Sequence, residues 1–289
     1  IYQCDWSSDV CSSDLISAAV SLADARIGKI GDQIYAGRPN SVLERSWISF
    51  KSSAWFAIVS GFLEPVLYLF SFGYGVGKLV GNVSLANGSV VTYAMFIAPG
   101  LLATSAMNGA IFDTTWNVYF KMHESKTYNA MLSTSLGPLD VALGEIAWAV
   151  LRGVIYSIGF MLVVTPLGLI PSWWGILAIL AAALIAFAFA SIGMALTSYF
   201  KSYQQLGLIE VFLLPIFLFS GSLFPTEILP NWANVIVKIS PLWHAIELIR
   251  NLCVGEIHLG LLVHVLFFLV LITFGLFILT RRLNNLFMK

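Results

Sequence analysis

The chain has 289 residues, of which 58% are hydrophobic and 10% are charged, and its mean hydropathy is +0.86. Soluble domains carry about 25% charged residues, so this composition excludes a water-soluble globular protein. The 15 basic and 15 acidic residues leave no net charge, which gives no indication of nucleic-acid binding.

The first 53 residues divide into two segments. Residues 1–15 (IYQCDWSSDVCSSDL) are rich in Ser and Asp and have no basic region followed by an apolar stretch, so they do not form a signal peptide. They resemble a translated sequencing adapter, and we interpret them as a non-native tail, with a genuine disordered tail as the alternative. Residues 16–53 form an N-terminal region whose last part, 41–53, places apolar residues such as Trp47 and Phe50 among polar ones. This pattern predicts an amphipathic helix on the membrane surface.

Six apolar stretches of about 20 residues follow, each long enough to cross about 30 Å of hydrocarbon. They cover residues 54–77, 91–112, 141–164, 173–197, 206–224 and 260–280. The linker 225–259 is too apolar for an ordinary solvated loop, and Pro241 divides it into two short helices that re-enter the outer interface. The sequence thus predicts an all-α polytopic membrane protein, with a transmembrane domain over residues 54–289.

The distribution of Lys and Arg predicts the orientation in the membrane. With the N-terminus inside, eleven basic residues face the cytoplasm and three face outward. The inner set is Arg26, Lys29, Arg38, Arg45, Lys51, Lys121, Lys126, Lys201, Arg281, Arg282 and Lys289, and the outer set is Lys78, Lys238 and Arg250. Both termini are therefore expected in the cytoplasm.

Two charged side chains fall deep inside predicted spans. Glu64 lies ten residues into the first span and Arg152 eleven residues into the third. A rise of about 1.5 Å per residue places both about 15 Å deep. Because an unpaired charge at that depth is costly, we predict a Glu64–Arg152 ion pair, with substrate contact as the alternative. Glu145 and Glu210 lie near the cytoplasmic boundary, where they are either solvated or contact a cytoplasmic partner or an inner gate.

No catalytic or metal-binding set can be assembled from the sequence. The run 73–79 (GYGVGKL) has the Gly-Lys pair of a phosphate-binding loop, but it lacks the first glycine, the magnesium-binding hydroxyl and a preceding strand. We interpret it as a glycine-rich helix end. The four histidines have no metal-ligand spacing, and the three cysteines give no disulfide framework. The chain is therefore not expected to be an enzyme.

A polar stretch between the second and third spans suits a protein interface. Residues 113–136 can form a short amphipathic cytoplasmic helix that combines aromatic anchors with a charged rim. A solvated loop is the alternative. The candidate contact residues are Tyr119, Phe120, Lys121, Met122, Glu124 and Tyr128.

Several separated segments resemble the ABC-2 family of transporter permeases, and within it the lipo-oligosaccharide (nodulation factor) exporter type. The resemblance covers roughly residues 41–289. The segments that carry it are 63–77 (LEPVLYLFSFGYGVG), 96–107 (FIAPGLLATSAM), 126–145 (KTYNAMLSTSLGPLDVALGE), 217–230 (FLFSGSLFPTEILP) and 239–250 (ISPLWHAIELIR).

This resemblance implies a permease of the bacterial cytoplasmic (inner) membrane that works as a homodimer or beside a homologous permease. A separate ABC ATP-binding subunit would hold ATP and magnesium, so no cofactor is expected in this chain. That subunit would dock on the coupling region 119–128 and around residues 44–50. The substrate path would run between the two permeases, lined by spans one, two and five, with Tyr68, Tyr74, Phe217 and Phe219 as candidate contacts.

The resemblance also implies the kind of substrate. We expect a lipid-linked glycan, a lipo-oligosaccharide or a related amphiphile, with membrane lipid but not nucleic acid as a further partner. A drug or small-lipid exporter is the main alternative. A secondary transporter should show inverted internal repeats, which the two halves of this chain lack. A membrane enzyme would need a cluster of acid, base or metal ligands at one membrane face, and the sequence shows no such cluster.

Overall fold

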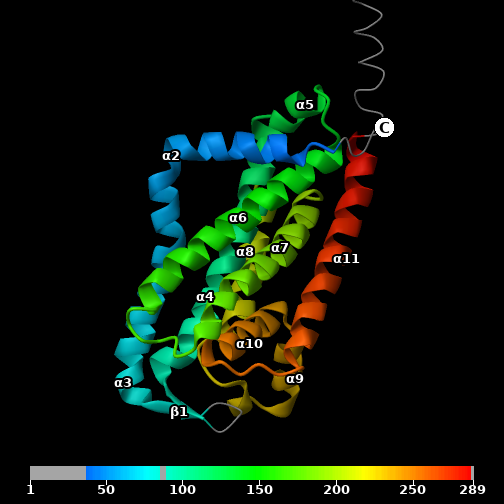
Figure 1. Cartoon of the computed structure of the whole chain (residues 1–289). Coiled ribbons are helices and arrows are strands. Elements are labelled where there is room, and N and C mark those ends of the chain that lie inside the picture. The colour runs from blue at the N-terminus through cyan, green and yellow to red at the C-terminus, as the bar shows by residue number, and fades with distance from the viewer. Residues whose placement is uncertain (1–36, 85–88, 288–289) are drawn as a thin grey trace, which may run out of the picture.

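A computed structural model of the protein describes residues 37–84 and 89–287 (Figure 1). The predicted non-native tail, residues 1–15, and residues 16–36 of the N-terminal region lie outside the described residues. The described chain is helical apart from one short hairpin. In chain order the elements are α2 (Pro39–Tyr68), η1 (Leu69–Val76), α3 (Gly77–Val80), β1 (Asn82–Ser84), β2 (Val90–Thr92), α4 (Tyr93–Phe112), η2 (Asp113–Asn117), η3 (Phe120–Glu124), α5 (Thr127–Leu132), α6 (Pro138–Val164), η4 (Trp173–Ile176), α7 (Leu177–Thr197), α8 (Gln204–Leu218), η5 (Thr226–Ile228), α9 (Asn231–Ile239), α10 (Pro241–Val254) and α11 (Leu261–Phe287).

The helical prediction is confirmed with one local exception. Strands β1 and β2 form an antiparallel pair in which Val83 lies opposite Val91. This hairpin joins the end of the first predicted span to the start of the second. The run 73–79 that resembled a phosphate-binding loop is helical, as interpreted, and belongs to η1 and α3.

Four helices of the described chain have the length and apolar character needed to cross a membrane. They are Tyr93–Glu124, Pro138–Val164, Trp173–Thr197 and Leu261–Leu286, and they correspond to predicted spans two, three, four and six. The fifth predicted span corresponds to α8, an apolar helix of 15 residues. This helix ends at Leu218, before the predicted boundary at Phe224, because the backbone of Phe219 is no longer helical. The chain then turns at Gly221, whose φ of +77° is left-handed.

Helix α2 is bent into two arms (Figure 1). The first arm lies across the end of the bundle and the second arm runs along the bundle toward α3. The first arm fits the predicted surface helix, since Trp47 and Ile48 are exposed while Val42 is buried against α6. A methyl group at Gly144 of α6 would lie 2.5 Å from Val42 Cβ, so the two helices approach this closely because the residue is glycine.

Asp140 ties the start of α2 to the start of α6. Its carboxylate accepts hydrogen bonds from the backbone N–H groups of Arg38 (2.8 Å) and Gly137 (2.9 Å). Farther along, the Trp148 ring of α6 packs edge-on against Phe50, with the ring centroids 5.0 Å apart. The first arm is therefore held by polar contacts at its start and by aromatic contacts near its bend.

Helix α4 occupies the centre of the bundle and packs against α2, α6, α7 and α10. Small side chains let the neighbours approach: Ala106 is fully buried, and a methyl group at Gly153 of α6 would lie 3.1 Å from the Ala106 carbonyl oxygen. Helix association in lipid depends on such close packing, because lipid chains are as apolar as the side chains themselves.

The second span does not end at Phe112, as the sequence predicted. The helix continues through the π-helical turns η2 and η3 to Glu124. The hydroxyls of Thr114 and Thr115 donate to the carbonyl oxygens of Ala110 (2.8 Å) and Ile111 (2.7 Å), so these polar groups are satisfied within the helix. Much of the predicted loop 113–136 is thus a helical extension of α4, which ends beside α5 (Figure 1).

Two short helices, α9 and α10, lie at the opposite end of the bundle from α5 (Figure 1), and they are divided at Pro241, as predicted. Helix α10 packs on α4, α7 and α11, with side chains such as Ile246 fully buried. The charge of Arg250 is compensated there, since its guanidinium donates to the Gly221 carbonyl (2.8 Å) and to the Glu247 carboxylate (2.7 Å).

Candidate functional site

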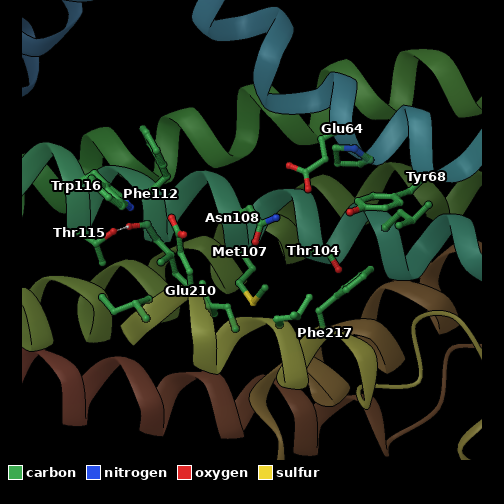
Figure 2. Close-up of a pocket in the computed structure, with 16 residues that line it drawn as sticks. Glu64, Tyr68, Thr104, Met107, Asn108, Phe112, Thr115, Trp116, Glu210 and Phe217 are labelled. Carbon is green, nitrogen blue, oxygen red and sulfur yellow. Dashed lines mark hydrogen bonds between the residues drawn. The ribbon is translucent and has the colours of Figure 1, made fainter. Parts of the chain in front are cut away.

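A cavity of about 340 Å³ lies between the second arm of α2, α4 with its extension, and α8 (Figure 2). These elements correspond to predicted spans one, two and five. Aliphatic side chains such as Leu101, Met107 and Leu213 line it, together with seven polar or amphipathic ones: Glu64, Tyr68, Thr104, Asn108, Thr115, Trp116 and Glu210. The cavity therefore offers both apolar surface and hydrogen-bonding groups to a bound molecule.

Two carboxylates reach the cavity from different helices. Figure 2 shows Glu64 on α2 and Glu210 on α8, with Asn108 of α4 between them in the view. Within the described part of the chain, no ion pair or hydrogen bond engages either carboxylate, and no lining residue is basic. Both carboxylates remain available to a ligand. Glu210, which the sequence placed at a solvated boundary or an inner gate, is a lining residue.

Aromatic rings stand at both ends of the cavity in Figure 2. Tyr68 and Phe217 lie at one end, with ring centroids 6.0 Å apart. Trp116 lies at the other end, and its ring packs edge-on against Tyr203 at 5.2 Å. The structure thus places two of the four predicted pathway aromatics on the cavity wall.

The other two predicted pathway aromatics do not line this cavity. Tyr74 stacks on Phe70 of the same π-helix, with centroids 5.7 Å apart, and is 40% exposed. Phe219 lies just after α8 and is 54% exposed. Both rings are therefore on the surface of the single chain.

The predicted Glu64–Arg152 ion pair is wrong. Arg152 pairs with Asp113 of η2, with Nη1 and Oδ1 2.5 Å apart. Asn117 also donates a short hydrogen bond to the same Asp113 oxygen. The depth argument failed because the sequence ended the second span at Phe112, which put Asp113 in a loop. The helical extension instead carries Asp113 into the bundle, where its side chain is 3% exposed.

A second ion pair links the same extension to α6. Lys121 Nζ lies 2.6 Å from a Glu145 carboxylate oxygen, and the Glu145 side chain is 3% exposed, so this residue is neither a solvated boundary charge nor a free partner contact. Tyr128 of α5 is buried near the Glu145 carboxylate. Burial, together with this carboxylate, raises the pKa of the Tyr128 hydroxyl well above its ordinary value. The two pairs fasten the extension of α4 to α6 at two points.

The turn formed by η3 and α5, residues Phe120–Leu132, is called the elbow below. It breaks at Lys126, whose φ of +48° is left-handed. Of the six predicted coupling residues, Phe120 and Glu124 are exposed and Lys121 is 24% exposed at its side chain. The other three face inward: Tyr119 and Tyr128 are buried, and Met122 packs against the core.

The exposed edge of the elbow lies at the same end of the bundle as the first arm of α2 (Figure 1). Glu44 and Arg45 of that arm are exposed, within the segment 44–50 that the resemblance assigned to partner contact. Two exposed charged surfaces therefore occur at one end of the molecule.

The structure also brings together two histidines that the sequence left scattered. Nδ1 of His244 on α10 and Nδ1 of His264 on α11 are 2.7 Å apart, so one ring donates a hydrogen bond to the other. No group of three or more metal-ligating side chains occurs among the described residues. The pair fastens α10 to α11.

Comparison with known proteins decides the family. A family model for the ABC-2 type transporter matches residues 40–254, which contain the cavity, the elbow and α10. The chain belongs to the ABC-2 type transporter family. It is therefore a membrane permease, a transport subunit rather than an enzyme, as the sequence predicted. Membership of this family implies an ABC ATP-binding partner.

The relatives of this permease include several proteins named nodulation protein J. The one from Rhizobium leguminosarum bv. trifolii is 35% identical over 218 residues, which cover 75% of this chain and 81% of the relative. The one from Sinorhizobium fredii is 35% identical over 232 residues, or 78% and 84% of the two chains. The one from Rhizobium meliloti is 32% identical over 225 residues, or 76% and 84%.

Sequence reasoning missed Asp113, Asn108 and Trp116. Asp113 stood one residue beyond the predicted end of a span, and Asn108 and Trp116 carried no charge to draw attention. The sequence did contain a signal for Asp113. Arg152 needed an acidic partner at its depth, and the span could continue past Phe112 because the hydroxyls of Thr114 and Thr115 can be satisfied inside a helix. For the other two, only the arrangement of α2, α4 and α8 around the cavity reveals that they face it.

Proposed function

We propose that this permease exports an amphiphile, a lipo-oligosaccharide or related lipid-linked glycan, across the bacterial cytoplasmic membrane with energy from a separate ATPase. The cavity between α2, α4 and α8 carries this proposal, because it joins apolar surface to carboxylate, amide and aromatic groups inside an apolar bundle. Sugar hydroxyls bind to carboxylates and amides, sugar faces pack on aromatic rings, and acyl chains need apolar contact. The similarity to proteins named nodulation protein J supports the same substrate class.

The proposed topology has six spans and both termini in the cytoplasm. The described chain begins beside the end of α11, so its two ends lie on one side of the bundle (Figure 1). Predicted cytoplasmic residues Lys121 and Lys126 belong to the elbow on that side, whereas Lys238 belongs to α9 on the other. The second arm of α2 with η1 and α3 would supply the first span, and α8 the fifth.

The elbow and the first arm of α2 would receive the ATPase, which would hold ATP and magnesium. The ion pairs Arg152–Asp113 and Lys121–Glu145 tie the extension of α4 to α6, so a push on the elbow would move α4 and α6 together. Because α4 forms one wall of the cavity, that motion would change the shape of the cavity. Transport would then follow from a population shift between two packings of the bundle.

A second permease, identical or homologous, would complete the path. Helix α8 exposes Val211, Phe212 and Leu214, and the second arm of α2 exposes Leu67. These apolar side chains flank the cavity, and a facing permease would bury them and close the open side.

The first test asks whether the elbow binds an ATPase. The tagged chain is purified in mild detergent from its host, and a stoichiometric ATPase is expected to co-purify. The double variant Phe120→Ala with Glu124→Lys should lose that subunit, because it removes the exposed ring and reverses the exposed charge. Trp232→Ala is the matched control, since this 71% exposed ring lies on α9 at the other end. Retention of the ATPase by the double variant, or its loss from the control, would contradict the assignment.

The second test concerns the cavity. In inverted membrane vesicles supplied with ATP, a fluorescent acylated oligosaccharide is expected to accumulate, and Phe217→Ala should reduce its accumulation at least about threefold. Phe219→Ala is the control, because this ring lies close by in the chain but does not line the cavity. Accumulation of a hydrophobic dye but not of the oligosaccharide would reassign the chain as a drug or small-lipid exporter.

A further inference from the structure

The cavity has an uneven charge composition that bears on which head groups it accepts. Its lining contains two carboxylates, those of Glu64 and Glu210, and no lysine, arginine or histidine. The amide of Asn108 adds an uncharged hydrogen-bonding group. The hydroxyls of Thr104 and Thr115 donate their hydrogens to the carbonyl oxygens of Gly100 and Ile111, so toward a ligand their oxygens act as acceptors. An acidic lining of this kind stabilises donors and cations and opposes anions.

The two basic residues of the α4 extension and α6, Lys121 and Arg152, do not correct this imbalance, because both are paired with other carboxylates. Arg152 is held by Asp113 at 2.5 Å, and its side chain is only 11% exposed. Lys121 is held by Glu145 at 2.6 Å. Neither lines the cavity. An anionic group that entered would face two carboxylates without a compensating cation in the lining, and their repulsion would weaken its binding.

The size of the cavity suits a head group rather than a whole amphiphile. Its volume of about 340 Å³ is at the lower end of the range for small-molecule pockets, about 300–1,000 Å³. Trp116 offers a flat ring at one end, and the aliphatic side chains of Leu213 and Leu214 lie on α8. A ring-shaped polar head could pack on Trp116 while an attached chain follows the apolar wall.

From this charge pattern we propose that the cavity selects amphiphiles whose head groups carry hydroxyl, amide or ammonium donors and no phosphate or other anion. The inference rests on the proposed export of an amphiphile and narrows it, because glycans linked to lipid through a phosphate or pyrophosphate would be poor substrates. Glu64 and Glu210 are the residues that determine this selectivity, by accepting donor hydrogens and repelling anions.

The test uses two probes that differ by one group: a fluorescent alkyl maltoside and the same compound with a phosphate on its terminal sugar. Binding of each to the full permease–ATPase complex in lipid nanodiscs is measured by fluorescence polarisation. The wild-type complex should bind the phosphorylated probe at least about tenfold more weakly than the neutral one. The double variant Glu64→Gln with Glu210→Gln should bind the two probes within about threefold of each other.

Two controls keep the result specific. Glu256→Gln removes a carboxylate outside the cavity, in the turn after α10, and should leave the discrimination unchanged. The single variants Glu64→Gln and Glu210→Gln should each lose part of the discrimination, which guards against misfolding of the double variant.

The inference is overturned if the wild-type complex binds the phosphorylated probe as tightly as the neutral one, or if the double variant keeps the full discrimination. Either result leaves the proposed export function intact, because an amphiphile is still bound. If neither probe binds the wild-type complex, the proposed substrate class itself is wrong, and the inference falls with it.

Discussion

Breaking the Asp113–Arg152 pair should destabilise the bundle far more than removing both charges together. The pair joins the extension of α4 to α6, with side chains 3% and 11% exposed. Arg152→Met would leave the Asp113 carboxylate buried beside Asn117 without a cation. Its Oδ2 atom already has no hydrogen-bond partner among the described residues, so little local compensation is available.

The magnitude follows from the separation and burial of the charges. Two unit charges about 4 Å apart attract by about 4 kcal/mol at an effective dielectric constant of about 20. Loss of one partner of a buried pair typically costs about 3–5 kcal/mol, whereas apolar replacement of both is often close to neutral. We therefore expect Arg152→Met and Asp113→Leu each to lower the free energy of unfolding by about 3 kcal/mol, and the double variant to lower it by about 1 kcal/mol.

The assay is unfolding in mixed micelles with increasing SDS, followed by tryptophan fluorescence. Glu64→Gln is the control, because the sequence paired Glu64 with Arg152 while the structure places it on the cavity wall. It should change the unfolding free energy by less than about 0.5 kcal/mol. The reasoning is refuted if the losses in the two single variants add in the double variant, or if Glu64→Gln is as costly as Asp113→Leu.

Three further predictions concern packing, helix capping and topology. Gly61→Ala should cost about 1–3 kcal/mol in the same unfolding assay, because the added methyl would overlap the Tyr156 ring of α6. Gly75→Ala, with nothing within 4 Å of the added methyl, should cost less than about 1 kcal/mol. Asp140→Ala should release the start of α2, seen as faster amide hydrogen exchange there and a loss of about 1–2 kcal/mol, and unchanged exchange would contradict its role. Replacing Lys238 by cysteine should permit labelling of intact cells by a membrane-impermeant thiol reagent while a cysteine at position 126 stays protected, and the reverse pattern would invert the proposed topology.

The sequence predicted the helical class, because long apolar stretches in a membrane leave the backbone no other way to satisfy its hydrogen bonds. It also predicted a helix over residues 41–53 and the break at Pro241. It placed span boundaries less well. The predicted second span stopped at Phe112, just before the acidic residue Asp113, although Asp113 pairs with Arg152 inside the bundle. Hydropathy scores a residue by its transfer cost alone, and it contains no term for a partner on another helix.

The candidate site was only half visible from the sequence. Tyr68 and Phe217 were predicted as pathway residues and line the cavity, whereas Tyr74 and Phe219 do not. An aromatic residue in an apolar span has no sequence feature that separates a cavity wall from a lipid-facing or protein-facing surface. The rotation of each helix about its axis makes that difference, and it is set by packing against neighbours.

Composition and hydropathy alone therefore determined that this is a helical membrane protein, and its separated sequence segments determined the ABC-2 type transporter family. The tertiary structure decided which charges neutralise each other and which remain free. Arg152 and Lys121 are paired with Asp113 and Glu145, and Glu64 stays on the wall of a cavity. The physical reason is that ion pairing depends on distances of a few ångströms between different helices. These distances depend on how each helix is rotated about its axis and on where it ends. Packing against neighbouring helices sets both, so the sequence of one helix does not determine them.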